Sequence, residues 1–78
     1  MGRQPKTDKD RVQNLVDKRR VELGLSRQDL ADLVQVHYQT IGYIERGEYQ
    51  PTLALAFRLA IALQCKIEDI FVFQGDSK

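Results

Sequence analysis

The apolar positions of this chain recur mostly at intervals of three and four residues, which is the spacing of an amphipathic helix. They predict a first helix that starts after a cap at Thr7 or Asp8 and ends near Leu23. The residues that define its apolar face are Val12, Leu15, Val16 and Leu23. Gly24 ends this helix, because glycine readily adopts the left-handed conformation that follows many helix C-termini.

Residues 24–47 predict two further short helices joined by a tight turn. Ser26 is the expected N-cap of the second helix, and Asp29 three positions later completes a capping box. The third helix is expected from about His37 to Arg46, with Gly47 as its stop. Two helices separated by so short a turn are typical of the helix-turn-helix motif.

The outer face of the third helix has an unusual composition. A helix face that only meets solvent usually fills with Lys and Glu, but this one carries Tyr38, Gln39, Thr40 and Tyr43. These groups suit hydrogen bonding to base edges in the major groove of DNA, which an α-helix fits. The alternative is a neutral face in a protein-binding domain of the same fold, since a fold does not dictate a function.

The remaining pattern predicts two more helices. Thr52 is the expected cap of a helix from Leu53 to about Leu63, and a short helix follows over about Ile67–Phe71. No alternating run is long enough to predict a strand, so the expected fold is all-α, with five helices in one small domain. The expected division is a flexible N-terminal tail (1–8), the domain (9–73) and a polar C-terminal end (74–78).

The fourth helix is apolar nearly all round, which is more apolar surface than one core contact needs. We expect Leu53 and Phe57 to face the core, together with Ala56, Ala60 and Leu63, and Leu55, Leu59 and Ala62 to form a second face. Exposed apolar patches usually mark interfaces. We therefore predict a two-fold homodimer through Leu55, Leu59, Ile67, Ile70, Phe71 and Phe73.

Charge refines this picture. The net charge is only +1, but residues 1–20 hold seven basic and three acidic side chains, while residues 21–78 hold five basic and eight acidic ones. A basic end suits phosphate, although a solvated tail explains it equally well. With one cysteine, Cys65, and one histidine, His37, the sequence offers no disulfide, metal cluster or nucleophile–base pair. No enzyme activity, cofactor, small-molecule ligand or membrane span is expected, and these absences point to the cytoplasm.

Residues 12–71 resemble the Cro/repressor-type helix-turn-helix family, also called the xenobiotic-response-element family. The matching segments are Arg20, Gly24-Leu25-Ser26, Leu30-Ala31, Val36, Gln39-Thr40-Ile41, Ile44-Glu45-Arg46-Gly47, Pro51-Thr52-Leu53 and Ile67-Glu68-Asp69-Ile70-Phe71. The resemblance implies a compact five-helix, lambda-repressor-like DNA-binding domain. It also implies a transcriptional regulator that is usually a homodimer.

The resemblance assigns roles to individual positions. It implies a structural ion pair between Arg20 and Glu45. The positions that commonly read base edges in the family are His37, Tyr38, Gln39 and Tyr43. The positions that often contact the DNA backbone are Ser26, Arg27, Gln28, Thr40 and Arg46.

The chain departs from the family pattern at three places. Gln35 occupies the turn position that usually holds glycine, so it is expected to adopt a positive φ or to shift the turn. His37 replaces the Ser or Thr that usually begins the third helix, and Tyr38 replaces a frequent arginine. These changes predict a weaker electrostatic contribution from this helix and an unfamiliar operator sequence.

Together these observations predict a DNA-binding transcriptional regulator that reads a pseudo-palindromic operator in double-stranded DNA as a homodimer. Repression by occlusion is the default mechanism, and activation through contact with polymerase is the other output. Two alternatives share the fold. One is an antitoxin-type protein-interaction module whose apolar C-terminal cluster binds a toxin, and the other is a controller protein of a restriction–modification system.

Overall fold

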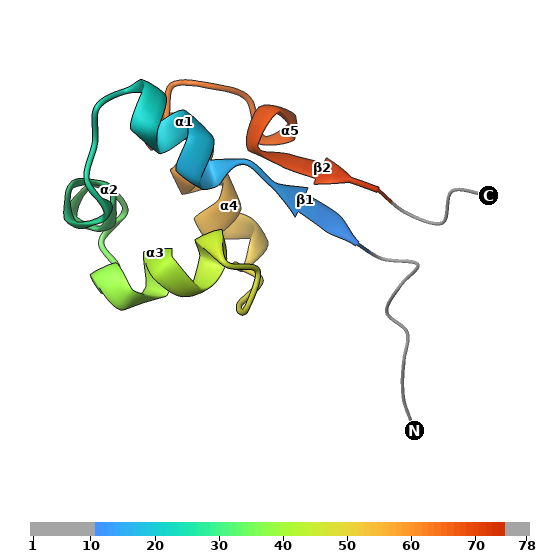
Figure 1. Ribbon diagram of the computed structural model, residues 1–78, viewed down its shortest axis with the longest axis horizontal. Coiled ribbons are helices and arrows are strands. Elements are labelled where there is room, and N and C mark those ends of the chain that lie inside the picture. Colours follow the sequence, from blue (N-terminus) through green and yellow to red (C-terminus); the bar gives the residue numbers. More distant parts are fainter. Residues whose placement is uncertain (1–10, 75–78) are drawn as a thin grey trace.

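The computed structural model describes residues 11–74, which form five helices and one two-stranded antiparallel sheet (Figure 1). Along the chain the elements are β1 (Val12–Asn14), α1 (Val16–Glu22), α2 (Arg27–Val34), α3 (Tyr38–Glu45), α4 (Leu53–Ala62), α5 (Ile67–Ile70) and β2 (Phe71–Phe73). The predicted all-α class broadly fits, but the structure also contains a small two-stranded sheet that the sequence did not predict. The predicted tail over residues 1–8 lies outside the described residues.

Local capping explains where α2 and α4 begin. The Ser26 hydroxyl accepts the Asp29 amide at 2.9 Å, and the Asp29 carboxylate accepts the Ser26 amide at 2.9 Å. The Thr52 hydroxyl accepts the Leu55 amide at 3.1 Å. Each bond satisfies a donor that the first turn of a helix leaves free. Gly24 has a φ of +72°, as predicted for the residue that follows the first helix.

The predicted start of the first helix is wrong. Val12 pairs with Phe73 and Asn14 with Phe71 in the β1–β2 ladder, so the segment before Leu15 is a strand instead of a helix (Figure 1). The Asn14 side chain helps to explain the switch: its oxygen accepts the Val16 amide at 2.9 Å, and its amide donates to the carbonyl of Ile44. The caps expected at Thr7 or Asp8 lie outside the described residues.

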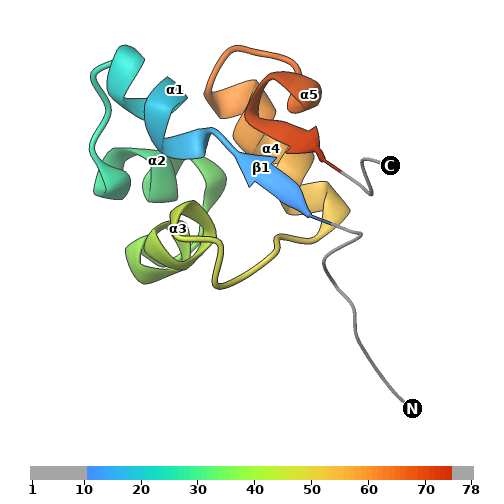
Figure 2. The same ribbon diagram turned by 45° about the vertical axis from the view of Figure 1, so that its right-hand side comes forward.

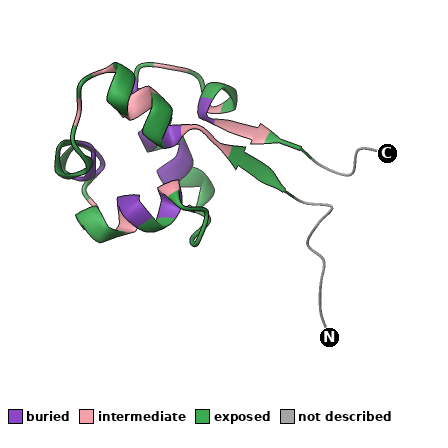
Figure 3. Ribbon diagram, viewed as in Figure 1, coloured by how far each residue is buried: buried purple, intermediate pink, exposed green. Residues whose placement is uncertain are grey.

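One hydrophobic core joins all five helices. Its members are Val16, Leu30, Ala31, Val34, Ile41, Ile44, Leu55, Leu59, Ala60, Leu63 and Ile70. Figure 3 shows these buried positions on the inner sides of the helices. In two views, α3 lies on the opposite side of the domain from α5 (Figures 1 and 2). The core therefore leaves the outer face of α3 free of contacts with the C-terminal elements.

The predicted orientation of α4 also needs correction. Leu55, Leu59 and Ile70 were expected at a dimer interface, but they are 5%, 0% and 0% exposed and belong to the core. Of the other predicted interface residues, Ile67 and Phe71 are partly buried against that core, and only Phe73 is well exposed.

A different stripe of α4 faces outward. Leu53, Phe57 and Ile61 are 69%, 49% and 76% exposed, and they follow one another at four-residue spacing along a single face. Leu53 and Phe57 had been expected to face the core. Because the helix is apolar nearly all round, its sequence does not define an inner face, and packing against α2 and α5 sets the rotation.

Candidate nucleic-acid interface

The turn between α2 and α3 has a fixed geometry. Gln35 adopts φ +63°, which is one of the two outcomes expected at a turn position that usually holds glycine. Val36 follows, and its amide donates to the carbonyl of Ala31 at 3.0 Å while its side chain packs against the core. The start of α3 is therefore held at a defined angle to α2, as a recognition helix requires.

His37 caps α3. Its Nδ1 accepts the Gln39 amide at 3.1 Å, and its ring stacks on Tyr38 with 5.6 Å between the ring centroids. A ring nitrogen that accepts a hydrogen bond carries no proton, so Nε2 is the nitrogen that remains for a partner. A single histidine thus ends the turn and presents one polar atom at the outer start of the helix.

The exposed row of α3 contains the residues predicted to read bases. Tyr38, Gln39 and Tyr43 are exposed, and His37 lies beside them at the helix start. The helix anchors itself through Ile41 and Ile44, which are fully buried. Core and presented groups therefore lie on opposite sides of one short helix.

Two aromatic side chains mark the far end of this face. Tyr43 lies beneath the Arg46 guanidinium, whose carbon is 5.3 Å from the ring centroid, a cation–π distance. Tyr49, in the loop after α3, joins Tyr43, Thr40 and Glu48 in lining a shallow hollow of about 460 Å³. Sequence reasoning missed Tyr49. The only sequence signal for it was an aromatic residue in a polar loop, two positions after Gly47, the glycine that ends the helix.

Glu45 ties three segments together. Its carboxylate is only 2% exposed and accepts Arg20 Nε at 2.6 Å, Arg20 Nη2 at 3.3 Å and Arg27 Nε at 2.9 Å. Arg20 also donates to the carbonyl of Leu25 at 2.9 Å. The ion pair expected between Arg20 and Glu45 is therefore present, and Arg27 joins it. This network fixes the end of α3 against α1 and the start of α2.

The other residues predicted to contact the DNA backbone have partners within the chain. Gln28 Nε2 donates to the Asp32 carboxylate at 2.8 Å, and Arg46 Nε lies 3.3 Å from the Glu48 carboxylate. Ser26 caps α2, and Thr40 is half-buried. The capping bonds hold the pKa of the Asp29 carboxyl below its ordinary value, chiefly through the Ser26 amide and then its hydroxyl.

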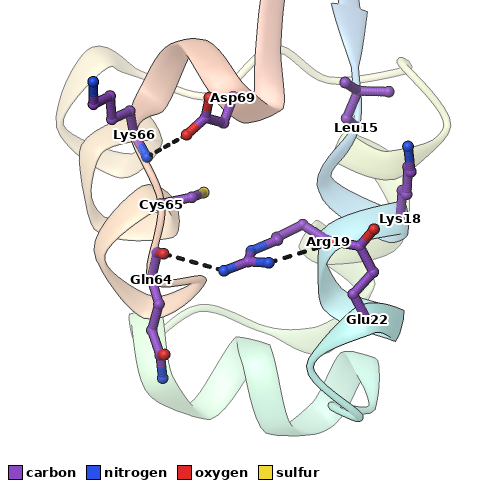
Figure 4. A pocket seen from close by; sticks show the side chains of 8 residues that line it. All are labelled: Leu15, Lys18, Arg19, Glu22, Gln64, Cys65, Lys66 and Asp69. Atoms are coloured by element: carbon purple, nitrogen blue, oxygen red, sulfur yellow. Dashed lines mark hydrogen bonds and ion pairs between the residues drawn. The ribbon is translucent and has the colours of Figure 1, made fainter.

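Arg19 is a structural residue that sequence reasoning missed. Its Nε donates to the carbonyl of Leu63 at 2.9 Å, where α4 ends. Its Nη2 donates to the carbonyl of Gln64 at 3.2 Å (Figure 4). It thereby joins α1 to the C-terminal end of α4 across an open pocket of about 630 Å³. Cys65 lines this pocket, and burial raises the pKa of its thiol, so it suits packing better than redox chemistry.

The described part of the chain holds no group of three or more His, Cys, Asp or Glu side chains that suits a metal ion. No helix among residues 11–74 is long and apolar enough to span a membrane.

The chain resembles known proteins in sequence and in fold. A sequence profile of the helix-turn-helix family matches residues 16–70. An uncharacterized HTH-type transcriptional regulator of Methanothermobacter thermautotrophicus is 46% identical over 66 residues, covering 83% of this chain and 96% of that protein. Another, YgzD of Bacillus subtilis, is 38% identical over 66 residues, covering 85% and 100%.

Solved structures agree with these relatives. The restriction-modification controller protein C.AhdI from Aeromonas hydrophila superposes with a TM-score of 0.67 and 30% identity, covering 69% of this chain and 82% of that one. A helix-turn-helix transcriptional regulator from Vibrio cholerae superposes with a TM-score of 0.62 and 34% sequence identity, and the match covers 68% of this chain and 30% of that one.

The architecture is thus that of a helix-turn-helix DNA-binding domain. The chain belongs to the Cro/repressor, or xenobiotic-response-element, type of helix-turn-helix family. It is a DNA-binding transcriptional regulator, which is a non-enzymatic kind of protein.

Proposed function

We propose that this regulator reads a pseudo-palindromic operator as a homodimer, with α3 in the major groove, and that it represses by occluding the promoter. The observation that carries the proposal is the exposed row of α3, where His37, Tyr38, Gln39 and Tyr43 stand outward from a fully buried apolar side. The Gln39 carboxamide suits the bidentate pattern of adenine N6 and N7. The tyrosines suit phosphate or a thymine methyl group.

The homodimer rests on the exposed stripe of α4. Leu53, Phe57 and Ile61 form an apolar face on a helix whose other apolar side already fills the core. A second copy of this chain suits the stripe, because two-fold packing matches a two-fold operator. Such a dimer places two α3 helices about 34 Å apart, one turn of DNA. Phe73, exposed at the end of β2, extends the proposed surface.

Selection of bound duplexes from a random DNA pool tests the reading function. We expect enrichment of a palindromic motif whose half-sites lie about 10 base pairs apart, centre to centre. On that motif Gln39→Ala is expected to cost about 1–3 kcal/mol and to relax base choice at one position per half-site. Gln13→Ala, an exposed glutamine on β1, is the matched control and should leave affinity unchanged. Equal loss on selected and random DNA for Gln39→Ala contradicts base reading.

The oligomeric state is tested by light scattering coupled to size exclusion. Ile61→Glu is expected to convert a dimer to a monomer, since it places a charge within the proposed apolar interface. Val21→Glu on α1 is the control, because Val21 is also well exposed, at 64%, but lies on another helix. A monomeric wild type at micromolar concentration, or a dimer unaffected by Ile61→Glu, overturns this interface.

A restriction–modification controller is the second candidate function. It is favoured by the similarity to C.AhdI, which spans most of that protein's length. The two candidates share their DNA chemistry and differ in what they control. Genes for a restriction endonuclease and a methyltransferase beside this one, and loss of their regulated expression on deletion, support the controller assignment. Their absence leaves the general regulator.

A further inference from the structure

Two arginines converge over Gly42, a buried position in the middle of α3. A Cβ placed on Gly42 would lie 3.1 Å from Nη1 of Arg46 and 3.8 Å from Nη1 of Arg27, and its third nearest atom is Cζ of Arg46. The two guanidinium groups come from different helices, one from the first residue of α2 and one from the residue after α3. They therefore share one small volume above the helix.

Each arginine is held by its Nε, while Nη1 points toward the shared volume. Arg27 Nε is bonded to Glu45 at 2.9 Å, and Arg46 Nε lies 3.3 Å from the Glu48 carboxylate. The Nη1 atoms are the arginine nitrogens nearest to Gly42, and among the described residues neither donates a hydrogen bond to a carboxylate. The Arg27 and Arg46 side chains are 43% and 47% exposed, so an incoming anion can reach both.

Two guanidinium groups this close repel each other even though each has a carboxylate beside its Nε, and an anion bound between them would offset that repulsion. A phosphate group is the anion that matches, because guanidinium groups bind its oxygens through paired N–H donors. Arg27 begins α2 and Arg46 follows α3, so both arginines belong to the helix-turn-helix. We propose that Arg27 and Arg46 bind a single DNA phosphate together, and that Gly42 lacks a side chain so that they can meet. This inference rests on the proposed contact between α3 and DNA.

The number of phosphates is measurable through salt. Each phosphate neutralised contributes about 0.9 to the slope of log affinity against log salt concentration on duplex DNA. If the arginines share one phosphate, Arg27→Gln or Arg46→Gln alone lowers affinity but keeps the slope, since the other arginine still holds the phosphate. In the double variant no arginine holds the phosphate, so the slope of log affinity against log salt concentration falls by about 0.9 per subunit. If instead each arginine binds its own phosphate, each single variant should lose about 0.9 of the salt slope per subunit, and the double variant should lose about twice that amount.

The measurement uses the full-length protein and a random-sequence duplex, titrated between about 50 and 200 mM salt. Lys66→Gln, which removes an exposed charge just before α5, is the control and should leave the slope unchanged. Slope losses in both single variants, or none in the double variant, overturn the shared phosphate. If the wild type binds neither this duplex nor any selected one, the proposed function fails together with it.

The Gly42→Ala variant tests the shared phosphate site without destabilising the fold. Alanine is the better helix former, and the atoms nearest its Cβ are the far ends of flexible side chains, so the melting temperature is not expected to fall. The methyl group lies 3.1 Å from Arg46 Nη1, so this nitrogen must move aside, and binding to the random duplex should weaken. A variant with unchanged stability and unchanged DNA affinity contradicts the role assigned to Gly42.

Discussion

Replacing Glu45 with alanine should destabilise the domain far more than replacing the exposed arginine that it binds. The Glu45 and Arg20 side chains are 2% and 14% exposed, and removal of the carboxylate leaves Arg20 buried with one remaining acceptor, the carbonyl of Leu25. Breaking a buried pair in this way costs about 3–5 kcal/mol. Arg27 is 43% exposed, so Arg27→Ala should cost no more than about 1 kcal/mol.

The stability that Glu45→Ala should lose is a large part of the total free energy of unfolding. A domain of 78 residues has a free energy of unfolding of about 4–12 kcal/mol. Loss of the Glu45 interactions should therefore lower the melting temperature by at least about 12 °C, at about 4–8 °C per kcal/mol. Urea unfolding followed by far-ultraviolet circular dichroism measures the free energy, and a thermal melt measures the temperature shift.

The double variant Arg20→Met/Glu45→Leu provides the internal check. Replacing both members of a buried pair with apolar side chains of similar size is often neutral, because no uncompensated charge remains. Its stability should therefore lie well above that of Glu45→Ala. If Glu45→Ala unfolds within about 1 kcal/mol of the wild type, the carboxylate is effectively solvated and the reasoning is refuted.

Three further predictions concern the core, a cap and the turn. Leu59→Ala should cost about 2–5 kcal/mol in urea unfolding, whereas Ile61→Ala should leave the unfolding of a diluted monomer nearly unchanged, because only Leu59 is buried. Capping lowers the pKa of Asp29 in the folded state, so the stabilisation from this carboxylate is present above about pH 4 and is lost as the pH falls through the lowered pKa. In Asp29→Asn the urea midpoint of unfolding should therefore depend less on pH across that acid range. Gln35→Gly should raise the unfolding free energy by up to about 1 kcal/mol, because glycine tolerates the positive φ, and an unchanged or lower value contradicts strain at that residue.

Features set by local chemistry could be predicted from the sequence. Ser26 and Thr52 cap their helices because a hydroxyl and an amide three residues apart meet in any helix start. The positive φ of Gln35 was one of the two outcomes that the family resemblance implied, because glycine usually occupies that turn position. The helical class and the exposed row of α3 followed from apolar periodicity, which depends only on neighbouring positions.

Features set by distant contacts could not be predicted in the same way. The strand Val12–Asn14 has only three residues, and its partner lies some sixty positions along the chain, so no local pattern distinguishes it from a helix turn. The rotation of α4 depends on its neighbours, because apolar residues surround it. For the same reason the contact of Arg27 with Glu45 was not foreseen, since its partner belongs to another helix.

The pairing of β1 with β2 has a mechanical consequence. This two-stranded sheet, which is not a hairpin because five helices separate its strands in the chain, brings Arg11 and Gln74 together. The Gln74 amide donates to the Arg11 carbonyl at 2.8 Å, and the Leu15 amide donates to the Ile70 carbonyl at 2.8 Å at the inner end. Tension applied between residues 11 and 74 would load these bonds one after another from the outer end, instead of shearing them together. The strands would separate at low force while α2 and α3 kept their arrangement, so a tether pulling on both ends would lengthen before it disturbed the face that meets DNA.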